Sequence, residues 1–236
     1  MTVSVRETAF DPYAELAAHE RRCFPRPGAF GASANFIGTM RDLNEGDAVT
    51  QMTLEHYPGM TERHLERICA EARARWAGRF PDRGRLRVGL VWAGDARPHL
   101  PMSNATDRRR SVRLETLAPL FAVEGVDFVS LQFGSRAGDR GRVAFGQRMA
   151  DPMAEVGDFA DTAAIVEQLD LVVTVDTAMA HLAGALARPV WVLSRFDGCF
   201  RWMSGRDDSP WYPTMRLFRQ SAAGDRIPAA ADQGAG

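Results

Sequence analysis

The sequence predicts an α/β protein, with a doubly wound parallel sheet in its C-terminal part and a small α+β segment before it. Three observations favour this fold class. From about residue 86 to 220, short apolar and β-branched runs alternate with helical segments, as in sheets covered on both faces. Residues 1–76 contain two extended runs followed by one helix. Residues 77–85, rich in Gly, Pro and Arg, separate the two parts, and we expect them to form a linker.

The N-terminal segment, residues 1–76, shows two strand patterns and one helix pattern. GASANFIGTMR (31–41) and TQMTLEHY (50–57) are predicted strands, and the DLNEGD between them has turn chemistry. An antiparallel hairpin with a fairly long loop is therefore expected. In TERHLERICAEARARW (61–76), Leu65 and Ile68 belong to a set of apolar residues at helical spacing, which predicts an amphipathic helix.

The C-terminal part alternates strands and helices in the order that a parallel sheet requires. Its tail, residues 221–236, has the composition of a disordered end. The predicted strands are RVGLVWAG (87–94), DFVSLQF (127–133), LVVTV (171–175) and PVWVLS (189–194). The predicted helices are VRLETLAPLF (112–121), DTAAIVEQL (161–169, capped at its start) and TAMAHLAGALA (177–187).

The composition of the chain excludes some classes of function. The 29 basic residues are all arginine, so mechanisms that need a lysine as Schiff-base nucleophile or titrating amine are excluded. A net charge of −1 gives no reason to expect a nucleic-acid partner. The three cysteines form no CxxC pair and the five histidines lack ligand spacing, so we expect reduced thiols and no metal site. No signal peptide or membrane-length apolar run is visible, and we expect a cytoplasmic protein.

The most informative stretch is LVVTVDTAMAHLAGALARPVWVL, residues 171–193. Asp176 and Thr177 lie where a predicted strand feeds a helix, the edge at which open α/β sheets bind ligands. The first N–H groups of that helix, from about Ala178 to Ala180, have no partners within it and can hold an anion. His181, four residues after Thr177, faces the same side and could donate to a phosphate or a sugar. The alternative is a plain helix cap with small residues for close packing.

A second cluster, NATDRRRS (104–111), follows the first strand of the same domain after a long polar loop. It would lie on the same edge as Asp176. Arg108, Arg109 and Arg110 offer forked donors suited to phosphate. The alternative is a solvated basic loop.

Segments of the C-terminal part, in order, resemble the C-terminal half of a GT-B glycosyltransferase with a Rossmann-like fold. The residues that carry this resemblance to heptosyltransferase-like and tetratricopeptide-associated enzymes are RVGLVWAG, DRRRSVRLETLAPL, FVSLQFG, DFADTAAIVEQLDLVVTVDTAMAHLAGALARPVWVL and RWMSGRDDSPWYPTMRLFRQ. The resemblance implies that a nucleotide-diphosphate sugar is the substrate and that no cofactor is needed. It also implies that Asp176, Thr177, Ala178 and His181 contact the donor. The segment with Arg108, Arg110 and Ser111 would line the same cleft.

GT-B enzymes have two such domains, and the first commonly supplies the acceptor site and a general base. The chain has no room for that domain. The resemblance therefore implies a binding domain that is possibly non-catalytic alone, and no catalytic residue is assigned.

The N-terminal segment resembles a different family. GASANFIGTMRDLNEGDAVTQMTLEHYPGMTERHLERICAEARARW (31–76) is similar to the first half of the molybdopterin synthase large subunit, TLEHYPGMTE being its most specific stretch. The resemblance implies that Arg41 belongs to a pocket for the molybdopterin precursor and for the small subunit's tail. It also implies a possible homodimer or partner chain. The family's essential lysines and His-Arg segment have no match here.

Three hypotheses follow. The first is a glycosyltransferase-like protein that binds a nucleotide sugar and carries an unrelated N-terminal segment. The second is a molybdopterin synthase catalytic subunit that transfers sulfur to the precursor. The third is a fusion of two partial genes without catalysis. The C-terminal part covers more residues and keeps its ligand edge, so the first hypothesis ranks highest.

Overall fold

A computed structural model shows two compact units, Met1–Arg75 and Trp76–Gly236. The structure describes residues 8–23, 43–44, 47–48, 57, 59–80 and 84–222.

The N-terminal unit contains two helices and a short antiparallel ladder. Helix α1 (Pro12–Cys23) was not predicted from the sequence; Asp11 caps it by accepting a hydrogen bond from the Tyr13 N–H at 2.8 Å, with proline at its first position. Helix α2 (Met60–Trp76) confirms the helix predicted at 61–76.

The antiparallel ladder joins β1 (Leu43–Asn44) to β2 (Asp47–Ala48). It therefore lies within the stretch that was predicted to be only a turn. The predicted strands 31–41 and 50–57 lie outside the described residues, except for Tyr57.

The second unit is built on a six-stranded parallel sheet in the order β5-β4-β3-β6-β7-β8. From central β3 the chain winds outward to β4 and β5, then returns to the other side of β3 for β6, β7 and β8. This is the predicted doubly wound parallel sheet. The strands are β3 (Leu86–Val91), β4 (Val126–Ser130), β5 (Met149–Ala150), β6 (Leu171–Val175), β7 (Val190–Ser194) and β8 (Met215–Arg219).

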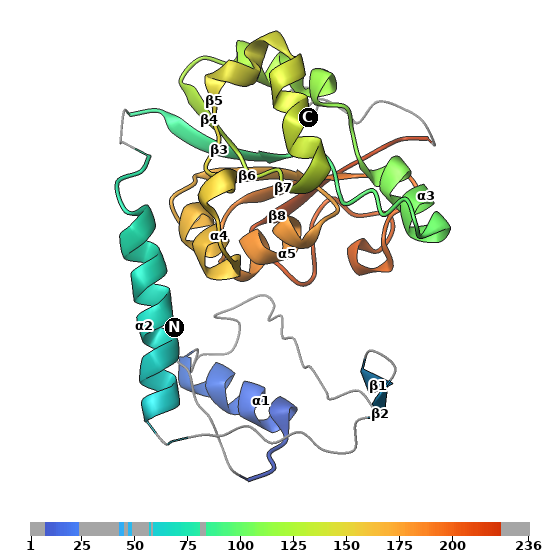
Figure 1. Ribbon diagram of the computed structural model, residues 1–236. Helices are drawn as coiled ribbons and strands as arrows, with labels where there is room; N and C mark the ends of the chain where they lie inside the picture. The colour runs from blue at the N-terminus through green and yellow to red at the C-terminus, as the bar shows by residue number, and fades with distance from the viewer. Residues whose placement is uncertain are drawn as a thin grey trace. The chain divides into compact units, whose positions relative to one another are not determined.

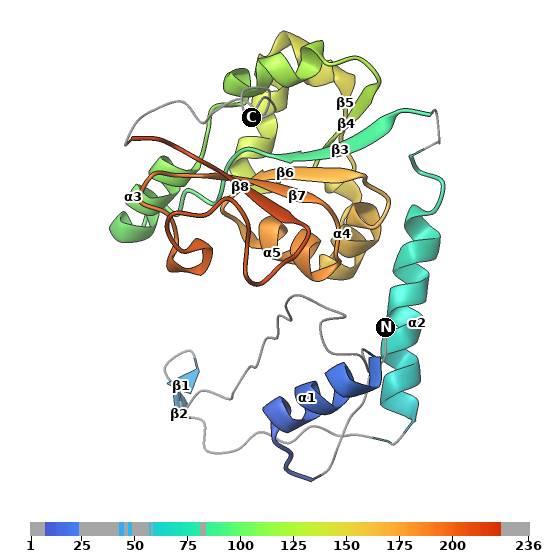
Figure 2. The same ribbon diagram turned by 180° about the vertical axis from the view of Figure 1, so that it is seen from behind.

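Helical segments cover both faces of this sheet. Helices α4 (Phe159–Val166) and α5 (Ala178–Ala185) lie on one face, and 3₁₀ segments between β3 and β6 cover the other (Figure 1). Helix α3 (Pro101–Arg110) lies beyond the carboxyl ends of the strands, as the two opposite views show (Figures 1 and 2). The 3₁₀ segments are η1 (Leu114–Ala122), η2 (Gly134–Arg142), η3 (Ala144–Arg148), η4 (Met153–Glu155) and η5 (Phe200–Trp202).

Several predicted elements need correction. The helix predicted at 112–121 is a 3₁₀ helix that contains Pro119, which has no N–H for an α-helical bond. Residues 104–110, for which a solvated basic loop was the alternative, belong to α3. Helix α4 starts at Phe159 with Asp158 as its cap, so Asp161 is not the cap. The strands predicted at 87–94 and 127–133 end earlier, and β5 and β8 were not predicted.

The core forms where the apolar faces of the sheet meet its helical covering. Leu90 and Trp92 from the β3 region are fully buried, and they share a cluster with Phe121 and Phe128, whose ring centroids are 4.2 Å apart. Gly89 also lies in β3, where a Cβ would overlap the side chains of Leu131 and Leu169. Close packing, rather than a turn, therefore requires glycine there.

The second unit begins with Trp76, whose side chain is anchored in it. The residue is 1% exposed, and its indole N–H donates to the Asp161 carboxylate at 2.7 Å. Gln168 donates to the Trp76 carbonyl at 3.0 Å. Arg79 pairs with Glu155, and Arg85 pairs with Asp127.

Two arginines of the predicted linker are thus attached to the second unit. Residues 81–83 of that linker lie outside the described residues. We therefore propose that any flexible joint within 77–85 is shorter than the sequence suggested.

We predict that Trp76→Phe lowers the free energy of unfolding by about 1–3 kcal/mol, because the buried Asp161 carboxylate loses a donor while the ring is kept. Trp211→Phe is the matched control, since its indole N–H donates to the Arg201 carbonyl at an exposed site. Urea denaturation followed by circular dichroism measures both. Equal losses in the two variants would contradict the prediction.

Candidate ligand pocket

A pocket of the second unit opens beyond the carboxyl ends of β3, β4 and β6. Its volume is about 660 Å³. Four segments contribute to its lining, at 93–97, 131–135, 156–159 and 177–179. Since the chain leaves β3 toward one side of the sheet and β6 toward the other, the pocket lies at the topological switch point, where doubly wound sheets bind ligands.

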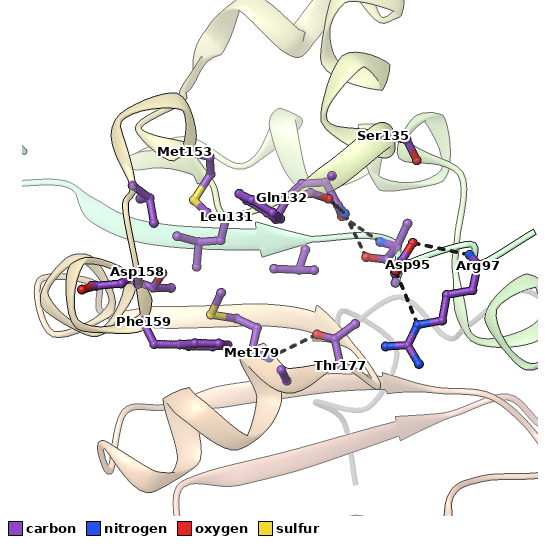
Figure 3. A pocket seen from close by; sticks show the side chains of 18 of the residues that line it. Asp95, Arg97, Leu131, Gln132, Ser135, Met153, Asp158, Phe159, Thr177 and Met179 are labelled. Atoms are coloured by element: carbon purple, nitrogen blue, oxygen red, sulfur yellow. Dashed lines mark hydrogen bonds and ion pairs between the residues drawn. The ribbon is translucent and has the colours of Figure 1, made fainter. Parts of the chain in front are cut away.

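The pocket has an apolar end and a polar end. Leu131, Met153 and Phe159 gather at one end, with Asp158 beside Phe159, and Asp95 and Arg97 lie at the other end (Figure 3). Phe159 is 67% exposed although it is a large aromatic residue. An exposed ring at the wall of a cavity is suited to contact with a flat apolar group.

The first turn of α5 supplies backbone donors to the pocket. Thr177 caps the helix: its hydroxyl accepts from the Met179 N–H at 3.3 Å, and its carbonyl accepts from the Ala180 N–H at 3.1 Å. The expectation that the N–H groups from Ala178 to Ala180 are all free is therefore wrong for two of them. In the part of the chain that the structure describes, the Ala178 N–H has no hydrogen-bond partner.

Arg110 is the cationic group fixed most firmly in the pocket wall. Its Nε donates to the buried Asp107 carboxylate at 3.0 Å, and Nη1 donates to the Asp176 carbonyl at 3.0 Å. A Cβ on Gly94 would overlap both Arg110 and Asp107. The absence of a side chain at Gly94 therefore gives the guanidinium its place.

The structure brings together only some of the predicted site residues. Arg110, Thr177 and Ala178 line the pocket. Ser111 lies behind the wall and accepts a hydrogen bond from the Gly94 N–H at 3.0 Å. Arg108 is exposed and is not part of the lining.

Two further predicted residues have other placements. The backbone carbonyl of Asp176 accepts from Arg110, but its side chain is not among the lining groups. Arg41 lies outside the described residues.

His181 belongs to an aromatic cluster instead of the pocket lining. Its Nδ1 is 3.0 Å from the Tyr212 hydroxyl, and its ring stacks on Trp202 with centroids 5.1 Å apart. Burial, and then the charge of Arg201, lower the pKa of His181 below its usual value of 6.5. Gly184 makes room for this cluster, because a Cβ there would overlap the Tyr212 ring.

The sequence analysis missed several pocket residues. Met153 lies between β5 and α4, and Phe159 is the first residue of α4; no ligand signal was visible at either. Gln132 is 2% exposed and holds two strand ends: its amide oxygen accepts from the Trp92 and Ala93 N–H groups, and its amide nitrogen donates to the Ala93 and Phe133 carbonyls. The sequence signal that could have indicated Gln132 is an amide side chain at the end of an apolar strand.

Searches for metal groups and membrane helices gave negative results within the described ranges. No three or more His, Cys, Asp or Glu residues there are grouped so that they could hold a metal ion. No helix in the same ranges is both long enough and apolar enough to cross a membrane.

Comparison with known proteins finds a sequence match in the N-terminal part. The MoaE protein family model matches residues 5–96, a range that extends past Trp76 and through β3. The molybdopterin synthase catalytic subunit of Ralstonia nicotianae is 51% identical over 75 residues, covering 32% of this chain and 40% of that protein. The Pasteurella multocida subunit is 40% identical over 107 residues, covering 44% and 65%. The chain thus spans well under the full length of these relatives.

Solved structures resemble the chain at low sequence identity. Escherichia coli ADP-heptose LPS heptosyltransferase II is 15% identical, with a TM-score of 0.43, covering 64% of this chain and 43% of that one. A glycosyl transferase of family 9 from Veillonella parvula is 13% identical, with a TM-score of 0.42, covering 65% and 40%. The N-terminal resemblance to molybdopterin synthase thus recurs in the sequence comparisons.

We predict that His181 makes the protein less stable as the pH falls below about 6.5, the unperturbed value for histidine. Because its pKa is lowered in the folded state, the unfolded chain binds more protons, and the free energy of unfolding decreases through this range. His181→Gln should remove this part of the pH dependence. The exposed His99→Gln is the control. Urea titrations at pH 7.5 and 5.5 measure the free energy of unfolding. If it falls by the same amount between these pH values in His181→Gln as in the unchanged protein, the prediction is wrong.

Proposed function

We propose that the second unit binds a nucleoside diphosphate, or the sugar that it carries, as a glycosyltransferase-like protein. One observation carries this proposal. A free helix N-terminal N–H at Ala178, a fixed guanidinium at Arg110 and an apolar end at Phe159 all line one pocket at the switch point of the sheet. Its volume of about 660 Å³ lies within the range of small-ligand sites.

The polar end suits a diphosphate. The N-terminus of α5 carries a partial positive charge and the Ala178 N–H, both of which favour an anion. Arg110 keeps Nη2 outside its hydrogen bonds to the described residues, so it can donate to phosphate without leaving Asp107. Arg97 adds an exposed guanidinium that pairs with Asp95.

The apolar end suits a nucleobase. Phe133 and Phe159 are exposed rings in the lining, and Met153 and Met179 lie beside them. Stacking of a base on an aromatic ring contributes about 1–3 kcal/mol. The base would then lie toward α4, and the diphosphate would lie at α5.

The remaining residues named by the glycosyltransferase resemblance have supporting roles in this proposal. Asp176 holds Arg110 through its carbonyl, and Ser111 holds the Gly94 N–H. His181 supports the far side of α5 through Tyr212. Binding is the proposed function, and no residue is assigned to a transfer step.

We predict that Ala178→Pro weakens binding of nucleoside diphosphates by about tenfold, the effect of one charge-assisted hydrogen bond. Proline is well accommodated at the first position of a helix. Thr177 has the extended backbone that a residue before proline adopts (φ −136°, ψ 175°). The substitution therefore removes one N–H and leaves the helix in place. Calorimetry with ADP, UDP, GDP and their sugars measures the change.

Ala178→Gly is the matched control, because it alters the same side chain and keeps the N–H. It should bind within about twofold of the unchanged protein, a difference below 1 kcal/mol. If none of the ligands binds at millimolar concentration, or if both variants bind alike, the nucleotide proposal fails.

The N-terminal match supports a second candidate function, sulfur transfer to the molybdopterin precursor. The observation in its favour is the MoaE family match over residues 5–96. We predict that the chain does not rescue a bacterial strain lacking the molybdopterin synthase large subunit. The resemblance implies a need for lysine amines, and the sequence contains none; arginine cannot replace them as a titratable group.

Complementation is scored by nitrate reductase activity, with the R. nicotianae subunit as the positive control. Rescue to the level of that control would reverse the ranking of the two functions.

A further inference from the structure

A second pocket, of about 350 Å³, lies next to the first and shares Ser135 with it. Figure 3 shows Ser135 at the rim of the first pocket. Two segments form the second pocket: the start of η1 and the 3₁₀ segment η2. Its other lining residues are Arg113, Glu115, Arg136, Asp139 and Arg142.

Asp139 organises the arginines of this pocket. Its carboxylate is largely buried and accepts from Arg136 Nε at 2.7 Å, from Arg142 at 3.5 Å and from the Trp92 indole N–H at 3.3 Å. Because Trp92 is fully buried at the end of β3, Asp139 is tied to the core. The arginines it holds are therefore fixed relative to the sheet.

The arginines keep unused donors. Arg136 hydrogen-bonds through Nε alone, so among the described residues its two terminal nitrogens have no hydrogen-bond partner. Arg113 makes an ion pair with Glu115 at 3.6 Å but no hydrogen bond to the described residues, and its side chain is 81% exposed. Free guanidinium nitrogens form the fork that matches two oxygens of a phosphate.

The charge count also favours an anion. Three guanidinium groups face two carboxylates in the lining, and Asp139 is shared between Arg136 and Arg142. The first pocket, in contrast, has equal numbers, with Arg97 and Arg110 against Asp95 and Asp158. The net positive pocket is thus the better site for an additional phosphate.

From these observations we propose that the pocket at Arg113, Arg136 and Arg142 binds a phosphomonoester group. This phosphate belongs to a second ligand, bound beside the molecule in the first pocket. Ser135 lies at the junction and offers a hydroxyl to either ligand. The phosphate site itself does not depend on the nucleotide function, because its residues other than Ser135 are not part of the first pocket. Its assignment to a second ligand rests on the proposed nucleotide site.

The test is calorimetric titration of the full chain with ribose 5-phosphate, with ribose as the uncharged probe. Binding of ribose 5-phosphate, but not of ribose, is expected. Arg113→Gln should weaken it about tenfold, the effect of losing a hydrogen-bonded charge. Glu115→Gln should strengthen binding, because it removes a competing carboxylate and frees Arg113. Arg113→Gln leaves the Asp139 contacts intact, so its result does not depend on folding.

The matched controls carry the same charge changes at the opposite edge of the sheet. Arg188 precedes β7 and Glu124 precedes β4, so Arg188→Gln and Glu124→Gln should change the affinity by less than about twofold, in line with screened distant charges. The proposal is overturned if ribose 5-phosphate does not bind at millimolar concentration. It is also overturned if the control variants change the affinity for ribose 5-phosphate as much as the pocket variants do.

Two further arms locate the phosphate and identify its source. Ala178→Pro should leave ribose 5-phosphate binding unchanged; loss of binding in that variant, with Arg113→Gln unaffected, would place the phosphate in the first pocket and overturn the proposal. Titration with ribose 5-phosphate in the presence of saturating ADP should give the same affinity for ribose 5-phosphate as titration without ADP. Competition by ADP would show that the extra phosphate belongs to the nucleotide itself, which would also overturn the proposal of a second ligand.

Discussion

The pocket edge of the α/β unit depends on the guanidinium of Arg110. It joins the last turn of α3 to the loop after β6, through the Asp107 carboxylate and the Asp176 carbonyl. Asp107 is buried, so without this partner it would be an uncompensated charge in the interior, which costs several kcal/mol. Gly94 is the matching constraint, because only a residue without a Cβ leaves space for the pair. One ion pair thus sets both the shape of the pocket and its charge.

The other walls are held by side chains that bind backbone. Gln132 links the end of β3 to the end of β4, and Arg110 links α3 to the loop after β6. Each side chain thus joins segments that are distant in sequence. Asp139 extends the same arrangement to η2 through Trp92. The hydrogen bonds of Gln132, Arg110 and Asp139 form networks of the kind that favour a single, preorganised arrangement.

The two units of the chain are characterised by different observations. The N-terminal unit is related in sequence to molybdopterin synthase, through a match that covers part of the length of those relatives. The second unit has its own buried core and its own pockets, and its first anchored residue is Trp76. The MoaE match runs beyond that residue to residue 96. The end of the sequence match therefore differs from the boundary between the two structural units. A nucleotide site in the second unit needs no residue of the first.

Sequence by itself determined the parallel sheet and helix α5, and it predicted a ligand site at the edge of the sheet where that helix begins. These features follow from local patterns: apolar runs, helical spacing and a capping residue next to a strand. Only the tertiary structure decided which groups meet there. Helix α3 has no apolar periodicity to reveal it, and Phe159 and Gln132 reach the pocket from the start of α4 and from the loop after β4. His181 turns to Tyr212 because Gly184 admits that ring. Such contacts depend on packing between residues far apart in the chain, and no local pattern encodes them.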